Sequence, residues 1–420
     1  MLVSTTPFPA RLGRFLSMAA ICAALLGPAT IARAQAEPDG DQAIRVATFN
    51  ILDVSTSDLL DEDNPRLQRV AEVLQRLRPN IVLVNEIAYD HHGVPGVPTD
   101  RPEGSNAQRF IDRYLAQPQA PGLAPLRYRA VMLPSNTGQA SGLDLDNSGQ
   151  AVTTYPVPAR SDAAGNPPRQ TEDGRAYGND CWGFGTYPGQ YAMALLVDER
   201  LEVLQSEIRS FRLLPWSAMP DARRPMLPDG TPWYNDEAWE AMRLSSKSHW
   251  DVPVRLPNGA VVHFLCSHPT PPAFDGEEGR NKARNHDEIR FWDDYLDNRA
   301  WIADDRQRIG GLERGRFFVI LGDLNADPEK GNDVGDPIGR LLRNPRVQSR
   351  AAPVHQEAVE GLAPSDTADF GLRVDYVIPS RGLGVVRSGV WTIPPAPRGG
   401  SSGFPSDHFP VWVELSVPPP

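Results

Sequence analysis

The chain has 420 residues and a formal net charge of −11 at pH 7, a balance that is poor for binding bare nucleic acid through counterion release. Bound divalent cations can reverse the local field, so nucleic acid stays open as a partner but is not favoured. No apolar run beyond the N-terminal 34 residues is long enough to span a bilayer.

Residues 1–34 have the pattern of a cleavable signal peptide. Arg11 and Arg14 precede an apolar run at residues 15–26, and a small-x-small sequence ends at Ala34, where we expect cleavage. Cleavage would leave 420 − 34 = 386 residues with a charge of −14, because the leader removes three arginines and no acid. We therefore expect a periplasmic or secreted protein.

The first elements of the mature chain form a strand–helix–strand unit. Residues 44–50 alternate in polarity and end at Asn50, and Asn64-Pro65 supplies a cap and a first-turn proline for a helix that reaches residue 78. A buried strand at residues 81–84 then delivers Glu86. Such units place their two strands parallel in one sheet.

The middle of the chain is expected to combine short elements with two long loop insertions. A helix and three strands are predicted at residues 107–116, 128–133, 191–197 and 201–211, the last two paired with each other. Residues 134–190 and 212–244, rich in glycine, proline and polar residues, predict loops or a lid within one domain, at residues 35–420. Cys181 and Cys266 are expected either as one disulfide or as two free, buried thiols.

Residues 247–256 and 260–267 read as a hairpin. If Asn258-Gly259 is its two-residue turn, His249 faces His268 across the pair, and Lys247 shares that face. A cation and a second imidazole would then lie where a phosphate needs donors. A bulge or a three-residue turn would instead rotate His249 away.

The chemistry is concentrated after a buried strand at residues 317–321. Gly322 is expected to permit a turn, after which Asp323 and Asn325 project the same way. A helix near residues 281–298 precedes this strand. The elements expected after it are a helix near residues 338–342 and strands at residues 373–378, 385–391 and 409–415.

Polar residues gather where the predicted strands end, although each of them alone could be a capping or hydrated group. The set is Asn50, Glu86, His268, Asp323, Asn325, Asp375, Asp407 and His408. Carboxylate and amide oxygens suit Mg²⁺ or Mn²⁺, with Ca²⁺ a third candidate. Histidines titrate near neutrality and can act as acid and base, so the set favours phosphoester hydrolysis.

These motifs resemble the endonuclease/exonuclease/phosphatase superfamily, which includes deoxyribonuclease-I-like enzymes, apurinic endonucleases, sphingomyelinases and inositol-polyphosphate phosphatases. The matching residues run in family order from about residue 44 to 416 and are Thr48-Phe49-Asn50, Asn85-Glu86, Ser267-His268, Gly322-Asp323-Leu324-Asn325, Asp375-Tyr376 and Ser406-Asp407-His408. The resemblance implies a four-layer α/β sandwich of two packed mixed sheets flanked by helices.

The resemblance also implies roles for the residues nearest the metal. Glu86 would hold the ion, with Asn50 and Asp407 close to it. Asp323 and Asn325 would position the attacking water or a second metal ion.

Further roles follow from the same family pattern. Asp375 would orient His408, and His268 would face the scissile phosphate, while the choice of acid and base stays open. Apart from that pattern, Arg280 and Arg284 are the next candidates for holding the substrate phosphate if Lys247 does not hold it.

The resulting hypothesis is an exported, divalent-metal-dependent phosphoesterase, expected as a monomer. Phosphate mono- or diesters that are small or lipid-derived are slightly favoured as substrates, because the chain is acidic. An extracellular nuclease is the alternative. A non-catalytic binding module is a third reading, which predicts a missing ligand or histidine; none is missing.

Overall fold

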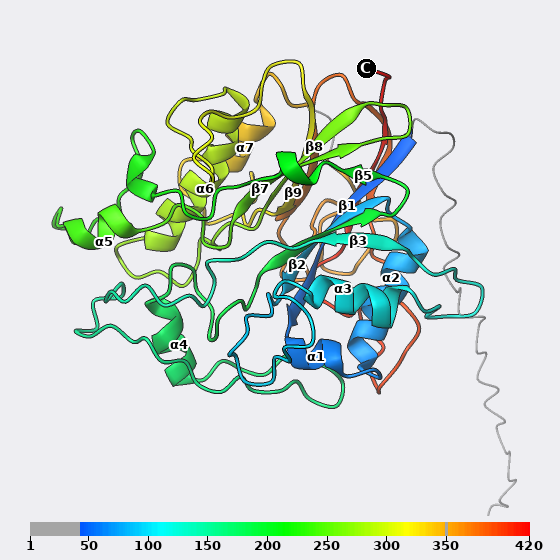
Figure 1. The fold of residues 1–420 in the computed structure, drawn as a ribbon, viewed down its shortest axis with the longest axis horizontal. Coiled ribbons are helices and arrows are strands. Elements are labelled where there is room, and N and C mark those ends of the chain that lie inside the picture. The colour runs from blue at the N-terminus through cyan, green and yellow to red at the C-terminus, as the bar shows by residue number, and fades with distance from the viewer. Residues whose placement is uncertain (1–42, 349–351) are drawn as a thin grey trace, which may run out of the picture. The chain divides into compact units, whose positions relative to one another are not determined.

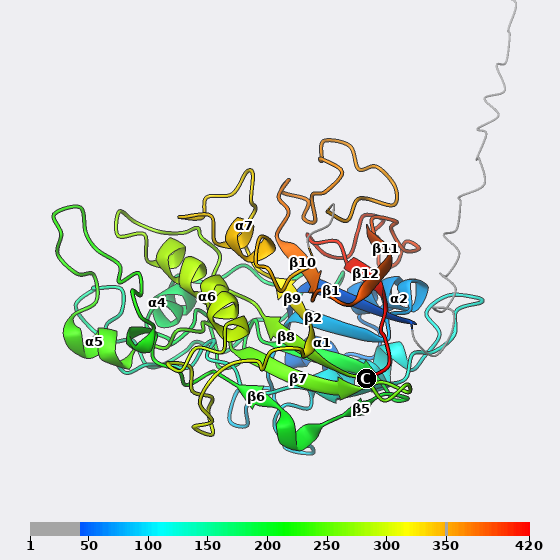
Figure 2. The same cartoon turned by 90° about the horizontal axis from the view of Figure 1, so that it is seen from above.

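Two mixed sheets of six strands each pack face to face (Figures 1 and 2). The computed structural model describes residues 43–348 and 352–420, so the expected leader at residues 1–34 lies outside the described residues. The first sheet has the order β11 (Gly384–Val390), β12 (Val411–Ser416), β1 (Ala43–Val54), β2 (Ile81–Ile87), β4 (Met193–Asp198), β3 (Tyr128–Val131). The second has the order β10 (Asp375–Pro379), β9 (Phe317–Asp323), β8 (Val261–Ser267), β7 (His249–Arg255), β5 (Glu202–Val203), with β6 (Arg209–Ser210) also paired to β7.

Helices cover the outer face of each sheet. Those of the first half are α1 (Thr56–Leu60), α2 (Pro65–Leu77) and α3 (Asn106–Phe110), which continues as a π-helix over Ile111–Leu115. The others are α4 (Glu172–Asn179), α5 (Asp236–Ala241), α6 (Arg280–Leu296) and α7 (Pro337–Leu342), with 3₁₀ turns at Gln205–Glu207 and Trp216–Ala218. Helices α2 and α3 share a core with the first sheet, and α6 and α7 with the second. The expected four-layer sandwich is therefore confirmed.

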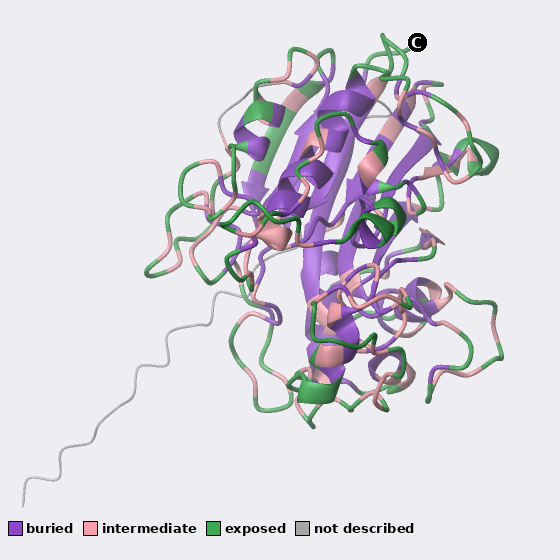
Figure 3. Cartoon of the chain, turned by 90° about the vertical axis from the view of Figure 1, so that its left-hand side faces the viewer, coloured by how far each residue is buried: buried purple, intermediate pink, exposed green. Residues whose placement is uncertain are grey.

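The central strands are buried on both faces, as Figure 3 shows. In β2, Ile81 and Leu83 point into the core between the sheets, whereas Val82 and Val84 point toward the helices. Side chains alternate along a strand, so a continuous apolar run fills two cores at once. The strand–helix–strand prediction is confirmed, because β1 and β2 pair in parallel.

One predicted pairing is wrong. Residues 191–197 and 201–211 were expected to pair, but β4 lies between β2 and β3 in the first sheet while β5 and β6 join β7 in the second. The chain crosses from one sheet to the other at a turn in which Leu201 N–H donates to the Asp198 carbonyl. Strand β4 has apolar side chains in both cores, which is typical of a strand inside a sheet that is covered on both faces.

The β7–β8 hairpin forms as expected, but its register is one residue away from the prediction. Leu256 N–H donates to the Ala260 carbonyl, and Gly259 adopts a left-handed φ of 86°, so the turn has three residues instead of two. His249 therefore pairs with Ser267. A one-residue shift moves a side chain to the other face of the sheet, so the expected pairing of His249 with His268 is wrong.

The long insertion at residues 134–190 is fastened to the second sheet's helix layer. The Arg284 guanidinium on α6 donates to the carbonyls of Trp182, Arg243 and Leu244. Buried Cys181 of this insertion and buried Cys266 of β8 are both free thiols. Among residues 43–348 and 352–420, none of the helices combines the length and hydrophobicity that crossing a bilayer requires.

Candidate active site

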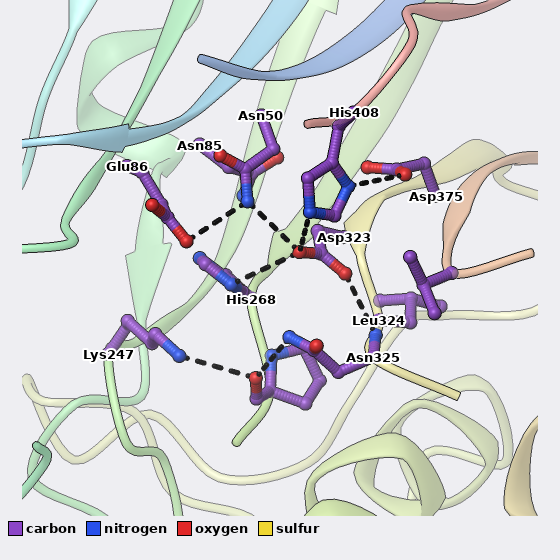
Figure 4. Close-up of polar contacts among 12 residues, drawn as sticks. Asn50, Asn85, Glu86, Lys247, His268, Asp323, Leu324, Asn325, Asp375 and His408 are labelled. Atoms are coloured by element: carbon purple, nitrogen blue, oxygen red, sulfur yellow. Dashed lines mark hydrogen bonds and ion pairs between the residues drawn. The ribbon is translucent and has the colours of Figure 1, made fainter. Parts of the chain in front are cut away.

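Asp323, at the end of β9, lies at the centre of the polar cluster shown in Figure 4. Its Oδ2 accepts a hydrogen bond from Asn50 Nδ2 at 3.1 Å and lies 3.4 Å from His268 Nε2 and 3.8 Å from His408 Nε2. Its Oδ1 accepts from the Asn325 N–H at 3.0 Å. Burial alone would raise the pKa of Asp323, but His408 and His268 together hold it well below its usual range. The carboxylate is therefore ionised at neutral pH.

Gly322 has a different role from the one expected. It lies within β9, paired with Tyr376, rather than at a turn. A Cβ at this position would meet the Ser267 carbonyl oxygen at 1.9 Å. Glycine is required because β8 and β9 approach closely where they present His268 and Asp323.

Asp375 faces Asp323 directly across the β9–β10 ladder, a position in which two like charges repel each other. His408 relieves the repulsion, since its Nδ1 lies 2.8 Å from Asp375 Oδ2 while its Nε2 faces Asp323. Burial opposes the charged ring, but the two carboxylates raise the pKa of His408 well above its ordinary value. Burial also raises the pKa of Asp375 to about 6. His408 is thus an imidazolium at neutral pH.

Glu86 occupies the opposite side of the cluster from Asp375 (Figure 4). Asn50 Nδ2 donates to Glu86 Oε1 at 3.1 Å, and the Asp53 N–H donates to Oε2 at 2.9 Å. Glu86 has a left-handed φ of 65°, which is uncommon for a residue with a side chain. Leu52, Asp53 and Asn325 share this conformation. Strained backbone conformations of this kind are concentrated at functional sites. There they give a side chain a direction that a regular strand would not give it.

The donor set fits a hard divalent cation. Glu86 keeps free lone pairs on both oxygens, and the buried carboxylate of Asp323 is ionised. Burial, and then the neighbouring charge of Glu86, raise the pKa of Asp407, although His408 acts in the opposite direction. Carboxylates that repel one another across a cleft are stabilised by a bound cation, and oxygen donors suit Mg²⁺, Mn²⁺ or Ca²⁺.

His268 and Lys247 form the wall between Glu86 and Asn325 (Figure 4). Burial, and then the charge of Lys247, lower the pKa of His268, whose Nδ1 has no hydrogen-bond partner among the described residues. Lys247 Nζ and Asn325 Nδ2 both donate to the Pro269 carbonyl, at 3.3 and 3.1 Å. A neutral imidazole, an ammonium and an amide thus face the same space, which suits an anionic oxygen.

Three residues proposed from sequence do not reach this site. His249 bonds to Ser245 Oγ and to the Glu288 carbonyl, and its ring packs on Phe291 and Trp292. The guanidinium of Arg284 is occupied by three backbone carbonyls.

Arg280 is also occupied elsewhere. It donates to the Leu145 carbonyl and to Asn179 Oδ1, and its Nε lies 3.6 Å from Glu278. Both arginines therefore attach the insertion to α6, and the suggestion that they hold the substrate phosphate is not supported by their contacts.

His249 should make the fold acid-sensitive without affecting the chemistry. Burial lowers the pKa of His249 to about 4, below the ordinary value of about 6.5. Between these pH values the unfolded chain binds a proton that the folded protein excludes, so the free energy of unfolding falls by up to about 3 kcal/mol as pH drops. Urea denaturation at pH 7 and pH 4.5 should show a smaller fall for His249→Gln than for wild type. Replacement of the exposed His92 by Gln is the matched control, and an equal fall in all three proteins contradicts the assignment.

Two neighbours of the cluster were not predicted. Thr367 Oγ1 donates to Asp375 Oδ2 at 2.8 Å and accepts from the Val374 and Asp375 N–H groups. The half-exposed ring of Phe370 stands edge-on to His408, with 5.4 Å between ring centroids. Both lie in an irregular loop whose sequence has no periodicity, so no local signal could have placed them at the site.

A four-layer sandwich with carboxylates and histidines gathered at one end of its two sheets is an architecture used by hydrolytic enzymes. The model of the endonuclease/exonuclease/phosphatase family matches residues 47–408. The chain belongs to this family, as its motifs implied. No curated protein matches the sequence.

Several solved structures are similar to the chain at low sequence identity. The chain is similar to the human Nocturnin catalytic domain, with 13% identity, coverage of 90% of this chain and 94% of that one, and a TM-score of 0.42. It is also similar to an endonuclease/exonuclease/phosphatase from Beutenbergia cavernae, with 16% identity, coverage of 90% and 72%, and a TM-score of 0.47. A mannosyl-6-phosphatase from Bacteroides thetaiotaomicron has 14% identity, coverage of 89% and 99%, and a TM-score of 0.42. At these identities and TM-scores the similarities carry no assignment of substrate.

Proposed function

We propose that the protein is an exported, divalent-metal-dependent phosphoesterase that hydrolyses phosphate mono- or diesters. The observation that carries the proposal is the ionised Asp323 carboxylate, buried between Asn50, His268 and His408. Burying this much charge in a single cluster costs stability, and such clusters with perturbed pKa values are concentrated at functional sites. Family membership supports a hydrolytic reaction on phosphoesters.

Glu86 and Asp323 are the residues proposed to hold the cation, with Asn50 and Asp407 beside them. The ion would neutralise phosphate charge and lower the pKa of a bound water. Asp323 and Asn325 orient the attacking water. His408, held as an imidazolium, donates a hydrogen bond or a proton to the developing charge.

His268 and Lys247 complete the proposed mechanism. The low pKa of His268 leaves its ring neutral and able to accept the proton of the water. Lys247 Nζ supplies positive charge to the phosphate oxygens, since its partner is a neutral carbonyl. The water oxygen bonds to phosphorus as the bond between phosphorus and the ester oxygen breaks, and the departing oxygen takes a proton from His408.

A phosphoester panel with and without EDTA tests the proposal. It contains p-nitrophenyl phosphate, bis-p-nitrophenyl phosphate, phytate, sphingomyelin and plasmid DNA. We expect turnover of at least one small or lipid-derived ester that EDTA abolishes and Mg²⁺ or Mn²⁺ restores. Turnover of plasmid DNA alone would establish the nuclease alternative, and absence of any turnover would favour a binding module.

Glu86→Gln should weaken cation binding more than substrate binding, because it removes an anionic ligand and keeps its shape. We expect the Kd for Mn²⁺, measured by titration calorimetry on the EDTA-treated protein, to rise by roughly tenfold or more. Glu278→Gln is the matched control, since Glu278 is buried on the Arg280 side of α6. Equal Mn²⁺ affinity in wild type and Glu86→Gln would refute the ligand role.

A further inference from the structure

A buried asparagine outside the proposed catalytic cluster organises a second group of cationic residues. Asn136 is fully buried, and its Nδ2 donates to the carbonyls of Arg212 and Ser245, each at 2.8 Å. Its Oδ1 accepts from Arg243 Nη1 at 2.5 Å, and its N–H donates to the Lys247 carbonyl at 2.9 Å. Asn136 thus contacts three residues that carry positive charge: the guanidinium of Arg243 and the main-chain carbonyls of Arg212 and Lys247.

Asn136 bridges the Arg212 main chain and the Arg243 guanidinium, and neither arginine forms an ion pair among the described residues. Burial, and then the charge of Arg212, lower the pKa of Arg243 to about 10. The charge of Asp305 raises the pKa of Arg243, but the Asp305 Oδ1 accepts from the Leu213 N–H rather than from Arg243. Other half-buried arginines are paired differently; for example, Arg209 has a carboxylate 3.0 Å away.

The orientation of the Arg243 guanidinium is fixed on two sides. Asn136 holds one nitrogen, and the Trp182 ring lies 4.8 Å below the guanidinium carbon. The remaining N–H groups of Arg243 have no protein acceptor in the described part of the chain. A guanidinium held in place with unused donors is suited to bind an oxyanion.

This cationic pair adjoins the proposed catalytic cluster. Asn136 contacts the Lys247 main chain, and the Lys247 side chain projects into the cluster beside His268 and Asn325 (Figure 4). Asn136 therefore links the Arg243 guanidinium to the main chain of Lys247, whose side chain belongs to the cluster.

We propose that Arg212 and Arg243 form a second anion-binding subsite, which holds an additional phosphate, sulfate or carboxylate group of the substrate. The inference rests on the proposed function for its role in turnover, whereas anion binding by the pair is independent of it. The favoured substrate class becomes phosphoesters that carry a second anionic group.

The test compares wild type with the double variant Arg212→Gln/Arg243→Gln. Glutamine at position 243 can still donate to Asn136, so the fold should be retained, which thermal unfolding checks. We expect the KM for glucose 1,6-bisphosphate to rise roughly 10- to 100-fold and the KM for glucose 6-phosphate to stay within about twofold. Equal changes for both esters, or no change for either, would overturn the subsite.

Titration of sulfate into both proteins supplies a second measurement that needs no turnover. We expect wild type to bind sulfate roughly tenfold or more tightly than the double variant. The control variant Arg299→Gln/Arg316→Gln removes the same charge from exposed arginines and should behave as wild type. Equal sulfate affinity in all three proteins refutes the subsite, whereas a selective loss without any phosphoesterase activity supports it and refutes the proposed function alone.

Discussion

Asp323→Asn should lower kcat/KM by roughly 10²–10⁴-fold while the protein stays folded. The amide keeps the shape of the carboxylate but cannot balance the charge of the His408 imidazolium and of a metal ion. Asn50 Nδ2, which now donates to Asp323 Oδ2, would face either an amide oxygen or a second donor. Removal of the charge relieves the repulsion with Asp375 across the ladder, but it also removes a carboxylate that His408 and His268 stabilise, so the free energy of unfolding should fall while the fold is retained.

Steady-state kinetics on the best ester of the panel and urea denaturation together check this expectation. Asp251→Asn is the matched control. Asp251 of β7 is equally buried, but it bonds to His263 of β8 and to Tyr295 of α6. The control should lose stability and keep its turnover. A wild-type kcat/KM in Asp323→Asn would show that Asp323 is not a catalytic residue and would contradict the proposed site.

The sandwich could be predicted because its central strands are long, apolar and bounded by clear caps. Asn64 caps α2 as expected, with its Oδ1 accepting the Leu67 N–H, and Pro65 occupies the first turn. The edge strands β5 and β6 have two residues each, too short for any alternating pattern. Their partner could therefore not be read from local sequence.

The predicted cluster residues come together, whereas the geometric extension to His249 failed for a definable reason. Asn258-Gly259 favours a two-residue turn, but Asn258 Oδ1 instead accepts the Ala260 N–H and its Nδ2 donates to the Val417 carbonyl. A contact with the distant C-terminal segment thus supports a three-residue turn. Lys247 still reaches the cluster because it precedes the regular part of β7, where the strand register does not fix its direction.

Asp375→Asn should reduce kcat by a factor within the same 10²–10⁴ range, through its effect on His408 rather than on substrate. Asp375 Oδ2 accepts from His408 Nδ1 and from Thr367 Oγ1, each at 2.8 Å, and an amide in its place can no longer stabilise the imidazolium by charge. Asp375 is a positioning residue in this scheme, so KM should change much less than kcat.

The pH profile separates this role from a merely structural one. In wild type the two carboxylates raise the pKa of His408, so its charged form persists as pH rises through neutrality. Without the Asp375 charge that pKa falls, and the alkaline limb of the kcat profile should move to lower pH. His408→Gln should lack this limb. Adding Asp375→Asn to His408→Gln should lower kcat little further, because both changes disable the same His408–Asp375 pair. Additive losses in the double variant, or an alkaline limb unchanged in Asp375→Asn, would mean that Asp375 does not act through His408.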